Sequence, residues 1–319
     1  MPPLTRYSLR RHTHATHWGS ALDSLAGLTR ACNLGDFGDP KIRAAIRDVF
    51  AHEIERFGHS FPHGCEYRKH WEVALAALTM RRGGVLRSDA TVLGVGAGNE
   101  PTAFWLTNHV ARVFATDLYA SHSGWQESAS ATMLTNPGRF WPGPWNARRL
   151  VAQHMNALDL QYEDESFHAI FSSSSIEHFG TPADVRRALA EMYRVLAPGG
   201  VLSISTELRL AGPPPGVPGI LMFSQSELSD IFTDGLDWDP DPSWDLAISS
   251  ETLATQQEFH EAAADVSRHG ALYYHRLSWS RYPHIVLRLG ERLFTSIHLA
   301  LRKPATAASS PCRAPTAAE

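Results

Sequence analysis

The fold of this chain is decided by Val92-Leu93-Gly94-Val95-Gly96-Ala97-Gly98-Asn99-Glu100, where an apolar run enters a glycine turn. The run from 90 to 95 contains β-branched residues and favours a short buried strand. Glycines at such a turn let the backbone approach a ligand closely, and the helix expected next presents unpaired N–H groups to an anionic group. A tight turn without a ligand remains the alternative interpretation of this motif alone.

Further apolar segments predict the rest of a sheet. Buried strands are expected near 110–116, 149–154, 169–173 and 200–206, with helical patterns between most of them. Strands that alternate with helices favour a parallel, doubly wound arrangement, and the segments 285–289 and 293–301 predict a closing antiparallel hairpin. We therefore expect an α/β fold with a Rossmann-like, seven-stranded, mostly parallel sheet, N-terminal helices and an insertion after the fifth strand.

The chain divides into regions of different character. Helices are expected over 41–57 and 66–81, and the proline-rich segment 211–219 marks a boundary after the fifth strand. The expected regions are an N-terminal arm and helical cap (1–84), a ligand-binding core (85–207), an insertion that covers the substrate (208–283), the closing hairpin (284–303) and a disordered tail (304–319).

Composition excludes several classes of protein. The 319 residues are 43% hydrophobic and 19% charged, as in soluble globular proteins, and no apolar run is long enough to cross a bilayer. A formal charge of −4 disfavours nucleic acid as a partner. The three cysteines lie far apart and form no metal-binding pair, and no apolar stretch follows the basic N-terminus. We expect a cytoplasmic protein without a bound metal.

A second motif, an acidic residue after the next strand, follows the glycine turn in the sequence. The strand expected near 113–116 ends in Asp117, about twenty residues after the turn, where doubly wound nucleotide-binding folds place an acid on the ribose hydroxyls. These two motifs leave the choice between a nicotinamide and a sulfonium cofactor open.

Two more segments follow in order. The first is Met155-Asn156-Ala157-Leu158-Asp159-Leu160, followed by a strand-like segment that ends in Glu177-His178-Phe179. The second contains Arg194-Val195-Leu196-Ala197-Pro198-Gly199-Gly200 before an apolar strand. With these four matches in the family's order, the chain up to residue 207 resembles the class I S-adenosylmethionine-dependent methyltransferases with a type 11-like domain.

The resemblance implies S-adenosylmethionine as cofactor and S-adenosylhomocysteine as its product. It places the methionine part and the ribose on the glycine turn, the ribose hydroxyls on Asp117, the adenine amino group on the Asn156 oxygen, and the methyl group near Ser172 and Ser173. The cofactor-binding residues expected are Gly94, Val95, Gly96, Ala97, Gly98, Glu100, Asp117, Leu118, Met155, Asn156, Ala157, Ser172, Ser173 and Arg68.

Three positions depart from the family pattern. Gly94 stands where the family usually has Asp or Glu, and Asn156 and His168 stand where Asp is common. Gly94 removes the usual support of the methionine amino group, and Glu100, which is close to it in sequence, is the candidate to supply the missing negative charge. Arg68 could meet the methionine carboxylate, although a solvated helix face is the favoured interpretation of residues 68–71.

Methyl transfer from a sulfonium is an in-line displacement, and a base is needed only if the acceptor must lose a proton. The candidates for a catalytic role are His178, Glu207, His122 and His275. A packing or helix-start role is the alternative for Glu177 and His178, and a solvated surface position is the alternative for His275.

We expect methyl transfer to a hydroxyl of a small molecule, such as a sugar or secondary metabolite. Methyl transfer to nitrogen or carbon is an alternative. A nicotinamide-dependent oxidoreductase and a non-catalytic partner-binding subunit, the latter suggested by Gly94, are the other classes. The acceptor is expected to be a small molecule rather than nucleic acid, and both a monomer and a homodimer remain open.

Overall fold

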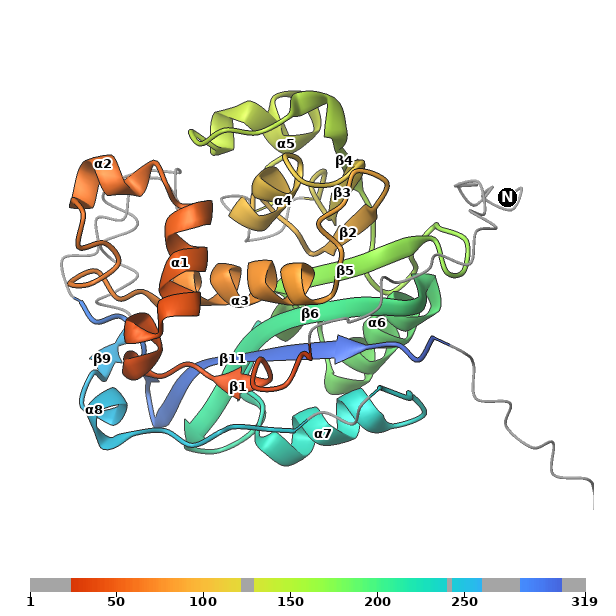
Figure 1. The fold of residues 1–319 in the computed structure, drawn as a ribbon. Helices are drawn as coiled ribbons and strands as arrows, with labels where there is room; N and C mark the ends of the chain where they lie inside the picture. The colour runs from red at the N-terminus through yellow and green to blue at the C-terminus, as the bar shows by residue number, and fades with distance from the viewer. Residues whose placement is uncertain (1–23, 122–128, 240–242, 260–281, 306–319) are drawn as a thin grey trace, which may run out of the picture.

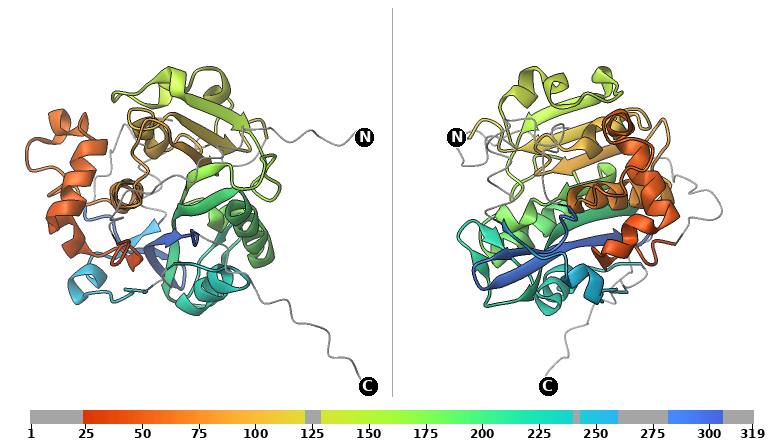
Figure 2. Two further views of the ribbon diagram at one scale, coloured as in Figure 1. Left: turned by 45° about the vertical axis from the view of Figure 1, so that its right-hand side comes forward. Right: turned by 90° about the vertical axis from the view of Figure 1, so that its left-hand side faces the viewer.

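A mixed β-sheet runs through the centre of the molecule (Figure 1), and helices cover both of its faces (Figure 2). The computed structural model describes residues 24–121, 129–239, 243–259 and 282–305. Five strands are parallel, in the spatial order β4-β3-β2-β5-β6. They are β2 (Thr91–Val95), β3 (Arg112–Asp117), β4 (Leu150–His154), β5 (Phe167–Ser173) and β6 (Leu196–Ala211).

The sheet continues beyond β6 with the predicted hairpin. The long strand β11 (Arg292–Arg302) lies antiparallel between β6 and β10 (Leu287–Leu289). These seven strands form the expected Rossmann-like sheet. Two strands of two residues are added to it, namely β9 (Gln257–Glu258) beside β10, and β1 (Arg30–Ala31), which pairs with the far part of β11.

Alternating side chains of the strands supply two apolar layers. Val92 of β2 packs toward α1 (Pro40–Val49), α3 (Arg68–Arg82) and α4 (Pro101–Leu106). Leu93, the next residue, packs toward α6 (Pro182–Val195) and α7 (Gln225–Thr233). Because both neighbours in sequence are completely buried, β2 is an interior strand, as its continuous apolar run predicts.

Three expectations about the elements need correction. The helix expected over 41–57 is two helices, α1 and α2 (Glu53–Phe57), because the chain leaves helical geometry at Phe50, whose ring is buried beside His70 and Trp141. The fifth strand begins earlier than expected, since Leu196 pairs with Phe167 of β5, and it ends later, since β11 pairs with it as far as Ala211. Within the expected covering insertion, α7 instead packs against α6 in the core.

Short elements complete the described chain. Several helices begin at side-chain caps; for example, Thr181 and Asp184 form a reciprocal capping box at the start of α6. The remaining elements are η1 (Leu34–Gly38), α5 (Thr132–Thr135), η2 (Pro137–Phe140), η3 (Ala147–Arg149), η4 (Ile176–His178), β7 (Gly216–Val217), β8 (Ile220–Leu221) and α8 (Ser250–Leu253). The expected disordered tail lies, from residue 306 onward, outside the described residues.

Candidate functional site

Three segments that the sequence placed at one edge of the sheet are joined there by hydrogen bonds. The N–H of Gly98 donates to Asp117 Oδ2 at 2.8 Å. The N–H of Met155 donates to the Asp117 carbonyl at 2.9 Å. The glycine turn after β2, the acid after β3 and the segment after β4 therefore meet at the carboxyl ends of the parallel strands, where open α/β sheets bind ligands.

The glycine turn has a conformation that requires glycine. Gly96 and Gly98 have φ angles of +61° and +46°, in the left-handed region that L side chains rarely adopt. At Gly96 a Cβ atom would lie 2.7 Å from the Cβ of Ser175, and the Ser175 hydroxyl donates to the Gly96 carbonyl at 2.6 Å. The turn that follows β5 is thus fastened directly to the glycine turn.

The groups suited to an adenosine lie beside this turn. Burial raises the pKa of Asp117, while the N–H groups of Gly98 and Leu118 that bond to its carboxylate oppose this effect. Leu118 is an exposed apolar side chain and Asn156 is also exposed. The Asn156 oxygen accepts the N–H of Leu158 at 3.0 Å, which fixes the side chain and leaves its second lone pair available. A carboxylate, an amide and an apolar surface fit a nucleoside here.

Phe171 occupies the space that an acidic residue at position 94 would need. A Cβ on Gly94 would lie 2.4 Å from Phe171 Cζ, which sits on the neighbouring strand β5. Glu100 is buried close by and accepts hydrogen bonds from Thr102, at 2.8 Å, and Ser173. Burial raises the pKa of Glu100 to about 7. The missing acid therefore has a nearby counterpart that can ionise when a cation arrives.

His168, the third departure from the family pattern, has a structural explanation. Its Nδ1 accepts the N–H of Thr91 at 3.0 Å, at the start of β2 and away from the carboxyl edge of the sheet. Its imidazole thereby links the beginnings of two adjacent strands, β2 and β5.

A buried cluster of charges lies beside the site, at the N-terminal turn of α3. Arg68 Nη1 donates to Glu207 Oε1 and Oε2 at 3.0 and 2.9 Å, to Ser296 Oγ at 2.8 Å and to Glu72 Oε1 at 3.3 Å. The solvated helix face expected for 68–71 is wrong, because all four residues are buried. Arg68 is paired with Glu207 and Glu72, and its contact with the methionine carboxylate stays a prediction.

Lys69 connects this cluster to the end of β5. Its ammonium lies 3.1 Å from Glu72 Oε1 and 3.9 Å from Glu207 Oε1, and it donates to the hydroxyl of Ser174. Burial acts to raise the pKa of Glu72, but Lys69 and Arg68 together lower it. Ser174 has a φ angle of +47°, so these polar contacts hold a strained residue at the end of a central strand.

Glu177 and His178 form the next turn, η4. The carboxyl of Glu177 is buried, and its Oε2 accepts the Thr206 hydroxyl at 2.8 Å. His178 bonds through Nδ1 to the Gly219 carbonyl at 2.7 Å, which ties η4 to the β7–β8 hairpin. Burial lowers the pKa of His178, while the bond to Gly219 acts in the opposite direction.

The expected site residues thus fall into three groups. The cofactor-binding positions from Gly94 to Glu100, with Asp117, Leu118, Met155, Asn156 and Ala157, come together at one edge of the sheet. Ser172 and Ser173 end β5 at this edge, but the Ser172 hydroxyl is completely buried. Arg68 and Glu207 pair with each other, and His122 and His275 lie outside the described residues.

The sequence did not identify Lys69, Glu72 and Ser296 as parts of the site. The spacing of Arg68 and Lys69 from Glu72 allows ion pairs within one helix face, and this is the one signal available in the sequence. That spacing is equally frequent on solvated helices. Ser296 could not be found, because it is 224 residues from Glu72, to which it donates a hydrogen bond.

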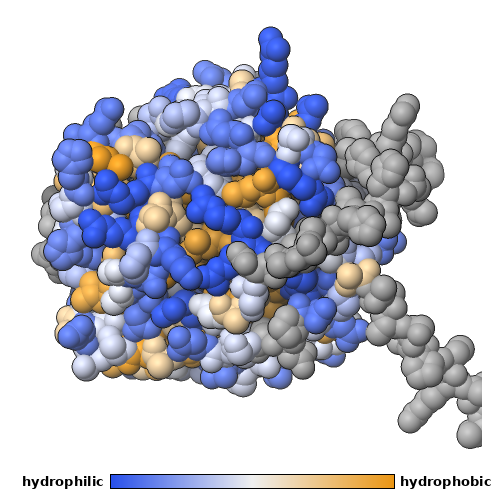
Figure 3. Space-filling view, viewed as in Figure 1, coloured by the Kyte–Doolittle hydropathy of each residue, from blue (hydrophilic) through white to orange (hydrophobic). Residues whose placement is uncertain are grey.

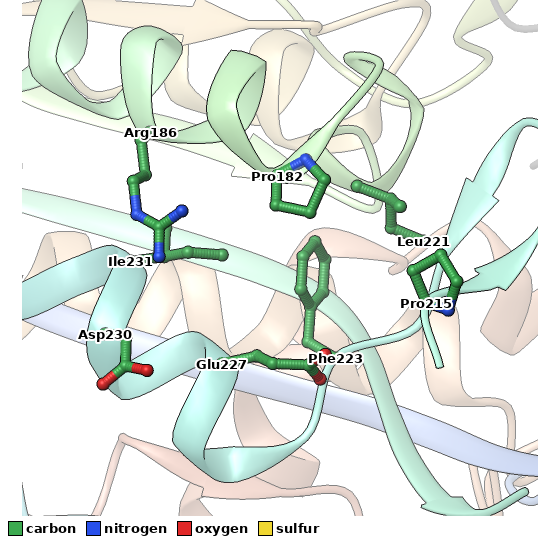
Figure 4. A pocket seen from close by; sticks show the side chains of 8 residues that line it. All are labelled: Pro182, Arg186, Pro215, Leu221, Phe223, Glu227, Asp230 and Ile231. Carbon is green, nitrogen blue, oxygen red and sulfur yellow. The ribbon is translucent and has the colours of Figure 1, made fainter. Parts of the chain in front are cut away.

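A separate pocket lies between α6, α7 and the β7–β8 hairpin (Figure 4). Its volume is about 70 Å³, well below the several hundred Å³ typical of cofactor pockets. Its lining residues are Pro182, Arg186, Pro215, Leu221, Phe223, Glu227, Asp230 and Ile231. None of the expected cofactor-binding residues contributes to it.

The surface in Figure 3 is mostly hydrophilic, with small apolar areas between charged side chains. In the part of the chain that the structure describes, no helix combines the length and apolar character needed to cross a membrane.

The architecture defines a class I, Rossmann-like nucleotide-binding domain. Comparison with known proteins specifies the family: residues 93–204 match the family model described as "Methyltransferase domain". The core of this chain is thus a class I S-adenosylmethionine-dependent methyltransferase domain, and S-adenosylmethionine is its cofactor.

Individual relatives are similar over limited ranges. "Probable tRNA methyltransferase 9B" of Mus musculus is 51% identical over 47 residues, which are 15% of this chain and 10% of that protein. The solved structure of the YcgJ protein from Bacillus subtilis is 18% identical, with a TM-score of 0.46, covering 74% of this chain and 99% of the other. Phosphoethanolamine N-methyltransferase 2 of Haemonchus contortus, solved with S-adenosyl-L-methionine, is 18% identical, with a TM-score of 0.46, covering 84% and 61%.

Proposed function

We propose that this chain transfers the methyl group of S-adenosylmethionine to a hydroxyl of a small molecule, such as a sugar or secondary metabolite, in the cytoplasm. The observation that carries the cofactor part is the pair of hydrogen bonds by which Asp117 joins the Gly98 turn and the Met155 segment. In this proposal Asp117 binds the ribose hydroxyls, Asn156 the adenine amino group, and Glu100 the methionine ammonium. The bound cofactor supplies an electrophilic methyl group, and the protein positions the acceptor for in-line attack.

Support for a small acceptor comes from charge. The chain carries a formal charge of −4, whereas binding along a phosphate backbone requires a basic surface. The similarity to a protein named as a tRNA methyltransferase covers only 47 residues, and RNA is therefore the second candidate acceptor. Nitrogen or carbon acceptors and a non-catalytic binding role are further outcomes for the test.

Calorimetric titration tests the cofactor part directly. We expect S-adenosylhomocysteine and S-adenosylmethionine to bind and NAD(H) to give no heat. Asp117→Ala removes the proposed ribose contact and should weaken S-adenosylhomocysteine binding by roughly tenfold to a hundredfold, because a lost hydrogen bond to a charged group costs about 1.5–3 kcal/mol.

The matched control is Asp89→Ala, since Asp89 is an exposed acid in the turn before β2, paired with Arg87. It should leave the affinity unchanged. Equal affinities of D117A and D89A would contradict the ribose assignment, and absence of heat with both adenosyl ligands would contradict the proposed function. Turnover of a hydroxylated small molecule, set against tRNA, then distinguishes the acceptor classes.

A further inference from the structure

The contacts of each candidate residue reduce the choice of the base that would take a proton from the acceptor. Glu207 is bound through both oxygens to Arg68 and has Lys69 nearby, so its negative charge is already matched. His178 donates through Nδ1 to the Gly219 carbonyl, and its Nε2 lies 3.8 Å from Glu177 Oε1. Both ring nitrogens of His178 therefore face oxygens of the protein.

One carboxyl oxygen of Glu177, Oε1, accepts no hydrogen bond from the described residues, since His178 Nε2, at 3.8 Å, lies beyond hydrogen-bond distance. The side chain of Glu177 is 1% exposed, and its Oε2 is bonded to Thr206. A buried carboxyl oxygen without a donor is costly in a stable fold unless a ligand completes it.

The position of Glu177 connects it to the cofactor site. It lies on the turn that follows Ser172 and Ser173, and Ser175 of this turn donates to the Gly96 carbonyl. The glycine turn and the Glu177 turn are thereby in direct contact.

The charges that face Glu177 come from three elements. Glu207 on β6 is a like charge, Lys69 on α3 is an opposite charge, and His178 is its neighbour on η4. Burial and the charge of Glu207 raise the pKa of Glu177 to about 8, although Lys69 and the Thr206 hydroxyl act against this. At neutral pH the carboxyl is therefore mostly protonated until another positive charge enters the site.

We propose that Glu177 is the catalytic base, and that its carboxylate is stabilised by the positive sulfonium of the bound cofactor. The inference rests on the proposed function. The acceptor oxygen forms a bond to the methyl carbon, the sulfur–methyl bond breaks with its electron pair on sulfur, and the hydroxyl proton passes to Glu177 Oε1. The reaction neutralises the carboxylate by protonation and the sulfonium by loss of the methyl group. The net charge of the buried site therefore stays the same.

The two adenosyl ligands provide a test that needs no acceptor, because S-adenosylmethionine carries a sulfonium charge that S-adenosylhomocysteine lacks. Calorimetry at pH 7 in buffers of different ionisation enthalpy measures the protons released by each ligand. We expect S-adenosylmethionine to release roughly half a proton more than S-adenosylhomocysteine. Protons released from Glu100 are common to both ligands and cancel in the difference.

Glu177→Gln should abolish that difference while leaving the affinity for S-adenosylhomocysteine within about threefold of the parent value. The matched control is Glu227→Gln, since Glu227 lies on α7 and pairs with Arg209 instead of facing Glu207 and Lys69. E227Q should retain the difference. An unchanged difference in E177Q would overturn the inference, whereas absence of binding by either ligand would instead count against the proposed function.

A second measurement uses the unaltered chain, in case E177Q does not fold. The ratio of S-adenosylmethionine to S-adenosylhomocysteine affinity should rise as pH increases toward about 8 and then level off, because the sulfonium favours the ionised carboxyl. The rise should approach, and not exceed, about tenfold per pH unit. A ratio that is constant between about pH 6 and pH 9 would exclude Glu177 as the group that responds to the sulfonium.

Discussion

Position 94 is glycine where the family usually has a carboxylate, and an aromatic ring from the neighbouring strand lies next to it. Gly94 and Phe171 are adjacent in the β2–β5 pairing, and the ring fills the space above the glycine. Because the glycine is forced by its neighbour, its presence is compatible with a working cofactor site. In the proposed function, Glu100, which is buried just after the glycine turn, takes the place of the acid that position 94 lacks.

An acidic residue at position 94 should therefore destabilise the fold unless Phe171 is replaced by a smaller residue as well. Gly94→Asp is expected to lower the free energy of unfolding by about 1–3 kcal/mol, since its Cβ would lie 2.4 Å from Phe171 Cζ. The double variant G94D/F171V should be more stable than the sum of the two single changes predicts. Urea unfolding of the four proteins gives the coupling energy, and strict additivity would contradict the steric explanation.

Among the elements, α3 shows how far local sequence can be misleading. Its first turn carries charges at helical spacing, which predicts a solvated face, yet Arg68, Lys69 and Glu72 are buried against β6 and β11. The partner that decides this, Glu207, is 139 residues from Arg68. Charges at this spacing look alike on solvated and buried helices, so the sequence alone could not reveal the cluster.

The strands and the glycine turn were predictable because their signals are local. An apolar run, a turn that demands left-handed glycines at Gly96 and Gly98, and an acid after the next strand each follow from adjacent residues. The contacts of Glu177 with Thr206 and of Arg68 with Ser296 join segments that are far apart in the sequence. The sequence therefore predicted the edge at which the glycine turn and Asp117 meet, and it named Arg68 and Glu207 separately, but it could not predict that they pair.

Replacing Arg68 should destabilise the packing of α3 against β6 and β11. Arg68→Met leaves Glu72 and Glu207 without their guanidinium, and loss of one partner of a buried ion pair typically costs about 3–5 kcal/mol. Arg81→Met on the same helix breaks an exposed pair with Asp48 and should cost less than about 1 kcal/mol. Urea midpoints of the two variants provide the measurement, and similar losses would show that the cluster does not stabilise the fold.

In the whole molecule, buried histidines and buried glutamates have opposite effects on how the stability of the fold changes with pH. Burial lowers the pKa of His70 to about 3 and that of His298 to about 4, so their contribution to stability is present above the ordinary histidine value and is lost as pH falls. Burial raises the pKa values of Glu100 and Glu177, so their contribution is present at low pH and is lost as pH rises through about 7 and 8. The ligand-free chain should be most stable in mildly acidic solution.

His70 offers the clearest test of this balance, because its ring is enclosed by Phe50, Phe61 and Tyr67. In His70→Phe the fall in unfolding free energy between about pH 6.5 and pH 4 should be shallower by up to about 1.4 kcal/mol per pH unit. His59→Phe, at an exposed position, should leave the slope unchanged. Equal slopes in all three proteins would refute the role of His70, whatever their absolute stabilities.

The interior place of β11 has a consequence for how the protein is made. This strand comes from the end of the described chain, yet it pairs with β6, β10 and the early strand β1, and it supplies Ser296 to Arg68. A nascent chain emerging from the ribosome would expose every cofactor-facing loop before the strand that closes the sheet has been synthesised. Productive folding of the sheet must therefore wait until β11 has been synthesised, and until then the open edge of β6 is a natural target for chaperones.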